Sequence, residues 1–154
     1  MTQRTCTVPA TAHMFFMEKI VTGAAGRDEL QQFVKDCDLI MRFRPTPVEH
    51  AEVLCYQTHA MYQLREDRDL VRYQAGFAAE MAKHNRVLYA YVSSAILALT
   101  CQSISPAERY ERLHEGVSRE MVHLDRFVWR CSEQEYKLAE SLITGAYESA
   151  NFRR

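Results

Sequence analysis

Residues 67–101 read DRDLVRYQAGFAAEMAKHNRVLYAYVSSAILALTC, and this stretch decides the fold. It contains no proline, so no residue in it lacks a backbone donor for helical hydrogen bonds. One stripe recurs along it at three- and four-residue spacing, the pattern of a buried helical face. The residues of this stripe are Leu70, Phe77, Met81, His84, Leu88, Val92, Ala95 and Leu99. We therefore expect either one long helix or two helices stacked on a single axis.

The second half of this stretch, residues 87–100, is apolar on nearly every side. A helix of that kind needs partners on several faces, so it belongs in the centre of a bundle. The stretch thus predicts an all-α fold with one long central helix.

Helix signals continue on both sides of the central stretch. Residues 27–43 carry apolar side chains with clean amphipathic spacing, and residues 11–22 form a shorter helical segment. Further helices begin where a hydroxyl residue is followed three positions later by glutamate, because the two side chains cap the first turn reciprocally. These start signals are Thr46 with Glu49, Ser105 with Glu108, and Ser132 with Glu135.

These signals predict one domain, a bundle of about six helices covering residues 11–154. Residues 1–10 show no periodicity and are expected to form a loose arm. No run of alternating β-branched residues predicts a strand. Short connections between the helices favour antiparallel neighbours.

Composition excludes several classes of function. Lys and Arg total 19 and Asp and Glu total 20, giving a net charge of -1 over 154 residues. Nucleic-acid binders usually gather a basic excess on one face, so we expect no nucleic-acid partner. The apolar run ending at Leu99 is too short and too rich in hydroxyl groups for a membrane span, so no membrane partner is expected.

The cysteines favour a reducing compartment. Their number is odd and no two of them form a CxxC pair, so neither a disulfide framework nor a zinc site is indicated. We therefore expect a cytoplasmic protein. The five are Cys6, Cys37, Cys55, Cys101 and Cys131.

The most favoured function is binding to other proteins without catalysis. The helix predicted over residues 47–65 has two apolar sides, so it is either internal or shared with another subunit. Residues 13–21 are also apolar on several sides and suited to a partner's groove. We expect a homodimer or higher oligomer, because symmetric self-association is the default form of such contacts. The predicted interface residues are Met14, Phe15, Met61, Tyr62 and Leu64.

A metal- or haem-binding bundle, serving as a sensor or oxidoreductase, is the alternative. Helical bundles hold iron through carboxylates and histidines on facing helices, or haem through an axial histidine. The candidate ligands are His59, Glu80 and His84. In the one Glu-x-x-His pair, His123 points away from its helix's apolar row and Glu120 lies only at the rim of that row, which weakens this alternative.

Nucleophilic catalysis has less support. Cys55 and His59 lie one helical turn apart, which permits a thiol–imidazole contact. The chain offers no glycine-rich turn that would supply an oxyanion hole.

Overall fold

The computed structural model describes residues 11–123 and 128–152, and the predicted arm, residues 1–10, lies outside these ranges. Within them the structure consists of α-helices and two π-helical segments with no strand, which confirms the predicted all-α bundle, and residues 11–15 are helical as well. The elements are η1 (Phe16–Ile20), α2 (Arg27–Arg42), α3 (Pro47–Gln63), α4 (Arg68–His84), α5 (Leu88–Thr100), α6 (Pro106–Arg112), η2 (Leu113–Ser118), α7 (Arg119–His123) and α8 (Glu133–Phe152).

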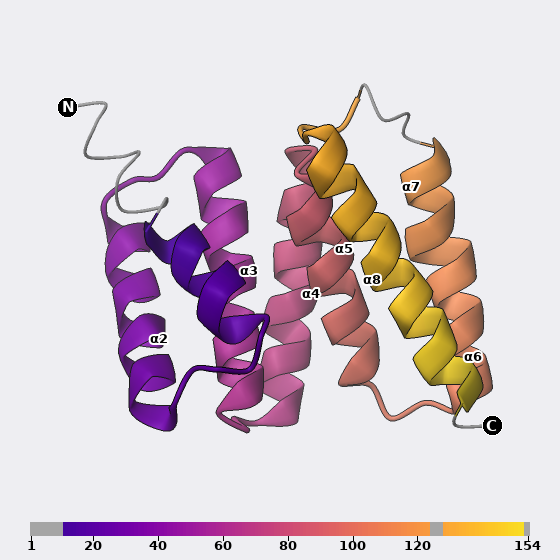
Figure 1. The fold of residues 1–154 in the computed structure, drawn as a ribbon, viewed down its shortest axis with the longest axis horizontal. Helices are drawn as coiled ribbons and strands as arrows, with labels where there is room; N and C mark the ends of the chain where they lie inside the picture. The colour runs from indigo at the N-terminus through magenta and orange to yellow at the C-terminus, as the bar shows by residue number, and fades with distance from the viewer. Residues whose placement is uncertain (1–10, 124–127, 153–154) are drawn as a thin grey trace.

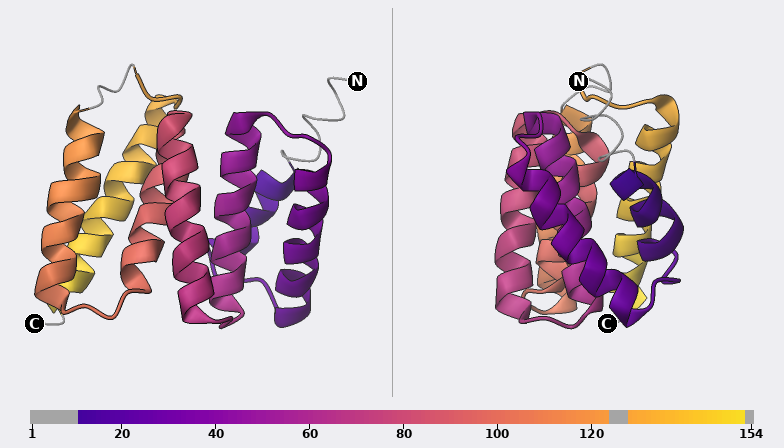
Figure 2. Two further views of the ribbon diagram at one scale, coloured as in Figure 1. Left: turned by 180° about the vertical axis from the view of Figure 1, so that it is seen from behind. Right: turned by 90° about the vertical axis from the view of Figure 1, so that its left-hand side faces the viewer.

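The helices stand side by side, and most neighbours in sequence are neighbours in space (Figures 1 and 2). From one end of the molecule the order is α2, α3, α4 and α5. α8 then packs between α5 and the continuous helical rod formed by α6, η2 and α7. η1 lies across α3, where the ring of Phe16 stacks on that of Tyr56 with centroids 4.4 Å apart.

The predicted helix starts are confirmed. The hydroxyl of Thr46 accepts a hydrogen bond from the Glu49 amide at 3.2 Å, and the Glu49 carboxylate accepts from the Thr46 amide at 2.9 Å. Ser105 and Ser132 each accept from the amide three residues later, at 3.1 and 3.2 Å. These side chains satisfy amides that the first helical turn leaves without a partner.

The prediction of one long helix, or of two helices stacked on one axis, over residues 67–101 is wrong. Residues 67–101 form two helices, α4 and α5, which lie side by side instead of stacking on one axis (Figure 1). Arg86 adopts a left-handed φ of 61°, and the Val87 amide turns back to the Ala82 carbonyl at 2.8 Å. The side chain of Asn85 donates to the Met81 carbonyl at 2.9 Å, which satisfies another acceptor at the helix end. Backbone geometry of this kind ends a helix without glycine or proline.

The buried face of α4 is also the opposite of the predicted one. Leu70 and Phe77 are 49% and 53% exposed, and His84 is exposed too. On α5 the predicted stripe does face the core: Leu88 and Val92 have no exposed surface, and Ala95 and Leu99 are half-buried. α4 turns small side chains toward α3 and α5, because they let helix backbones approach closely. Its buried residues are Val71, Ala75, Ala78, Ala79 and Ala82.

α3 is the internal helix of the first half of the molecule, contacting α2, α4 and α5. It carries a buried amide: the Gln57 side chain is 4% exposed and donates to the Val34 carbonyl at 3.0 Å and to Asp38 Oδ1 at 2.7 Å. Gln74 of α4 donates to the oxygens of Gln57 and Thr58, both at 3.0 Å. Because an unsatisfied buried amide is costly, this network favours one register of α2, α3 and α4.

Candidate interaction surface

The outward face of α4 carries three large apolar side chains in one stripe. Leu70, Tyr73 and Phe77 are 49%, 77% and 53% exposed. Their spacing of three and four residues places them on the same side of the helix, opposite the alanine face. We call these three residues the α4 stripe. This is the spacing with which helices anchor in a partner's groove or against a partner helix.

Charged side chains border the α4 stripe. Arg72 Nη2 lies 3.5 Å from Asp69 Oδ1, and both side chains are largely exposed. Glu80 and His84 are exposed on the same outward side, one and two turns beyond Phe77. An apolar centre with a polar border is the general anatomy of a protein interface.

Other exposed large apolar residues are more dispersed, except that Leu39 and Phe43 lie four residues apart at the carboxyl end of α2. Within the described residues they are Met14, Val21, Leu39, Phe43, Tyr62 and Leu138. Exposed apolar residues that occur singly are normal on protein surfaces, whereas a stripe on one helix indicates a contact site.

The predicted interface residues on α3 and at its end differ in accessibility. Met61 is 6% exposed and belongs to a small core cluster with Val71 and Leu97, so it offers no surface in this structure. Tyr62 is 41% exposed, and Leu64 is half-buried. Only Tyr62 of these three presents a large accessible side chain.

The two predicted interface residues before η1 are likewise unequal. Met14 is 57% exposed. Phe15 is half-buried, because its ring stacks on Phe33 of α2 with centroids 4.7 Å apart. Phe15 therefore packs the amino-terminal segment against α2, whereas the side chain of Met14 is mostly exposed to solvent.

The structure does not gather the candidate metal ligands. Glu80 and His84 lie on the exposed side of α4, whereas His59 lies on α3 with its Nε2 buried. No group of three or more His, Cys, Asp or Glu side chains suited to a metal occurs in the part of the chain that is described. Glu120 forms an ion pair with Lys83 at 3.6 Å, and the side chain of His123 lies outside the described residues.

Cys55 and His59 face a buried region between α3 and α5. Cys55 has no exposed surface, its Sγ lies 3.1 Å from the Ser93 hydroxyl, and burial raises the pKa of its thiol to about 11. Burial lowers the pKa of His59 to about 4, and a hydrogen bond with the Ser93 backbone partly opposes this shift. A protonated, buried thiol is a poor nucleophile, so this pair is better described as core packing.

The sequence does contain a sign of the α4 stripe, but periodicity alone does not assign that face to the surface. Residues 68–84 carry two apolar faces, one of large residues and one of alanines. Periodicity identifies both faces but does not say which one is buried.

Comparison with known proteins assigns neither a family nor a function to this chain. No protein-family model, curated protein or solved structure matches this chain. Among the described residues, no helix combines the length and the apolar character that crossing a bilayer requires.

Proposed function

We propose that this protein works by binding proteins, first of all a second copy of itself, and has no catalytic activity of its own. The observation that carries the proposal is the exposure of Leu70, Tyr73 and Phe77 on one side of α4. Aromatic side chains dominate interface energetics because they bury a large area at a small cost in conformational entropy.

A two-fold contact between α4 helices is compatible with the charges of this chain. At about 100° per residue, Glu80 lies beside the Tyr73–Phe77 pair, whereas Arg72 lies farther round the helix, next to the buried Ala79. Arg72 pairs with Asp69 of its own helix. With a net charge of only -1, two copies repel one another little.

The contact is expected to be weak. A stable interface usually buries about 800 Å² on each partner, and three side chains on one helix supply less. We expect dissociation in the micromolar range. Met14 and Tyr62, the accessible members of the set predicted from sequence, are candidates for a second contact.

The test is the concentration dependence of molar mass, measured by sedimentation equilibrium on the whole chain. Phe77→Glu places a charge at the centre of the stripe and should weaken association at least about tenfold, because an unpaired charge would be buried. Leu39→Glu is the matched control, since Leu39 on α2 is 52% exposed and Phe77 is 53% exposed. It should leave association unchanged.

A chain that stays monomeric at every concentration would remove self-association from the proposal. Association that Phe77→Glu and Leu39→Glu weaken equally, or not at all, would show that the α4 stripe is not the contact.

A cytoplasmic location is part of the same proposal. Cys37, Cys55 and Cys101 are buried free thiols, which fits a reducing compartment.

A further inference from the structure

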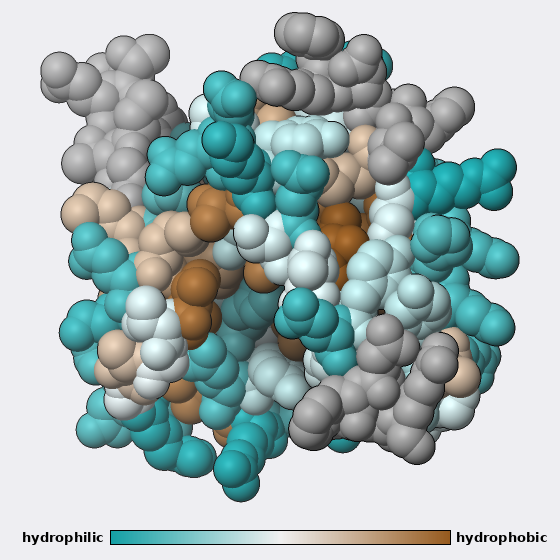
Figure 3. Space-filling model, turned by 45° about the vertical axis from the view of Figure 1, so that its right-hand side comes forward, coloured by the Kyte–Doolittle hydropathy of each residue, from teal (hydrophilic) through white to brown (hydrophobic). Residues whose placement is uncertain are grey.

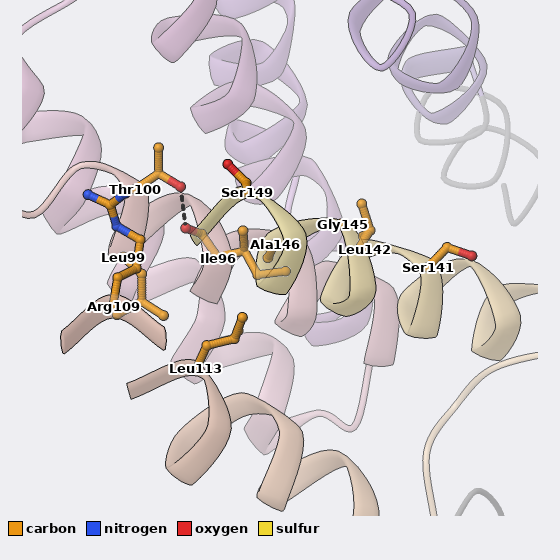
Figure 4. A pocket seen from close by; sticks show the side chains of 10 residues that line it. All are labelled: Ile96, Leu99, Thr100, Arg109, Leu113, Ser141, Leu142, Gly145, Ala146 and Ser149. Carbon is orange, nitrogen blue, oxygen red and sulfur yellow. Dashed lines mark hydrogen bonds between the residues drawn. The ribbon is translucent and has the colours of Figure 1, made fainter. Parts of the chain in front are cut away.

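A cavity of about 360 Å³ lies between α5, α6 and α8, away from the α4 stripe (Figure 4). Its size falls within the range of small-molecule sites, which in helical bundles form between helices. On the face drawn in Figure 3, polar side chains cover most of the surface and hydrophobic atoms lie in hollows between them. The apolar lining of the cavity consists of Ile96, Leu99, Leu113, Leu142 and Ala146.

One charged side chain lies at the edge of this apolar lining. Arg109 of α6 lines the cavity, and its Nε is buried with no hydrogen-bond partner among the described residues. Its neighbour Arg112 differs, because that guanidinium donates to Glu108 at 2.8 Å and to Gln102 at 2.6 Å. A buried guanidinium N–H without an acceptor is unfavourable, so an anion at this position would stabilise the site.

A second guanidinium strengthens the positive character of the same end. Arg109 lies next to Thr100 at one end of the cavity (Figure 4). Arg68 donates to the Thr100 backbone carbonyl at 2.7 Å. The Thr100 hydroxyl donates to the Ile96 carbonyl at 2.8 Å, so its oxygen remains able only to accept. The cavity therefore has one cationic end and an apolar body.

The walls of the cavity leave room for a ligand. A Cβ added to Gly145 of α8, which lines the cavity, would meet no atom within 4 Å. Leu113 is the first residue of the π-helical segment η2, and π-helical turns occur frequently at functional sites.

We infer that this cavity binds a small anionic amphiphile, an alkyl or aryl carboxylate. The carboxylate accepts hydrogen bonds from the Arg109 guanidinium, and the apolar tail lies against Ile96, Leu113 and Leu142. Arginine suits this role because its planar fork matches a carboxylate, and the apolar tail gains by leaving water. The inference does not depend on pairing through α4.

The test is isothermal titration of the whole chain with three ligands of equal chain length: octanoate, 1-octanol and octylammonium. Octanoate should bind most tightly and octylammonium least. Arg109→Gln should weaken octanoate binding at least about tenfold while changing octanol binding little, because it removes only the charge-assisted bonds.

A second variant fills the cavity without touching the charge. Gly145→Leu should weaken all three ligands together, since the new side chain occupies the space of the tail. Gly76→Leu is its matched control: Gly76 is also a helical glycine whose added Cβ would meet no atom within 4 Å, and it does not line the cavity. Circular dichroism of each variant checks that the fold is kept.

Equal affinity for octanoate and octanol, or octanoate binding that both Arg109→Gln and Gly145→Leu leave unchanged, would overturn the inference. Absence of binding by octanoate up to millimolar concentration would overturn it as well.

Discussion

α4 and α5 bury different kinds of side chain although they are adjacent helices of one hairpin. α4 buries mainly alanines and exposes its largest apolar residues, Leu70, Tyr73 and Phe77. α5 leaves none of its large residues exposed: Leu88 and Val92 are entirely inside, and Ile96 and Leu99 are half-buried. The difference teaches that the number of neighbours decides how much of a helix is buried, whereas side-chain size decides how near those neighbours come.

The two helices have different surroundings. α5 packs against α3, α4 and α8 and also contacts the helical rod of α6 and η2, so almost every side of it meets protein. Among the described residues, α4 packs mainly against α3 and α5, with one ion pair from Lys83 to Glu120 of α7, and its outward side remains open (Figure 2). Where a helix has partners on one side, alanines give close backbone contact and the opposite side is left for solvent or for a partner.

The largest expected difference comes from the same substitution, leucine to alanine, made once in each helix. Leu88→Ala in α5 should lower the free energy of unfolding by about 3 kcal/mol, because it leaves a cavity in the core. Leu70→Ala in α4 should change it by less than about 0.5 kcal/mol, as for most exposed positions. Urea denaturation followed by circular dichroism measures both values.

Equal losses for the two variants would contradict the burial difference. Leu70→Ala should also weaken self-association, which separates its role at the surface from any role in the core.

The next effect concerns His59 of α3, whose ring is half-buried and whose Nε2 is buried. His59 has its pKa lowered from 6.5 to about 4 by burial, so the unfolded chain binds its proton more tightly. Its contribution to stability is complete above pH 6.5 and is lost as the pH falls toward 4. Each pKa unit corresponds to roughly 1.4 kcal/mol, so the whole shift sets an upper limit on the loss of stability. Because the ring is half-buried, we expect a smaller loss of about 2 kcal/mol.

The measurement is the free energy of unfolding of the wild type and of His59→Gln at pH 7 and at pH 4. The wild type should lose about 2 kcal/mol more than the variant between these pH values. Identical losses would mean that His59 is protonated without cost in the folded state.

The smallest expected effect concerns the junction between the two helices. Arg86 has a φ of 61°, a conformation that an L-residue with a Cβ adopts at a cost of about 1 kcal/mol and glycine adopts freely. Arg86→Gly should therefore raise the free energy of unfolding by up to about 1 kcal/mol. Thermal and urea unfolding check this.

Arg86→Ala is the control, since it removes the same side chain but keeps the Cβ. It should not stabilise the protein. Equal stabilisation by glycine and alanine would trace the effect to the arginine side chain and not to the backbone.

The local sequence determined where most helices begin. Thr46, Ser105 and Ser132 each cap a helix start, and each was recognisable because capping involves residues three positions apart. The all-α class follows from apolar spacing in the same way, and the two apolar sides of α3 predict either an internal helix or one shared with another subunit. Interactions this short in sequence do not depend on the rest of the fold.

The candidate sites were harder to predict from the sequence. Met14 and Tyr62 are exposed, but Met61 lies in the core, and the sequence pattern assigned Leu70 and Phe77 of the α4 stripe to the interior. Nothing in the spacing of Arg109, Leu113 and Gly145 indicated a shared cavity, because they come from two helices that meet only in the folded chain.

Tertiary structure alone decided the break at Arg86 and the face of α4 that is buried. Both apolar faces of α4 satisfy helical periodicity, and a left-handed arginine carries no sequence signal. The free energy that selects between the two faces comes from close packing of alanines against α3 and α5. That packing exists only after the hairpin has closed, so the sequence of α4 by itself does not specify it.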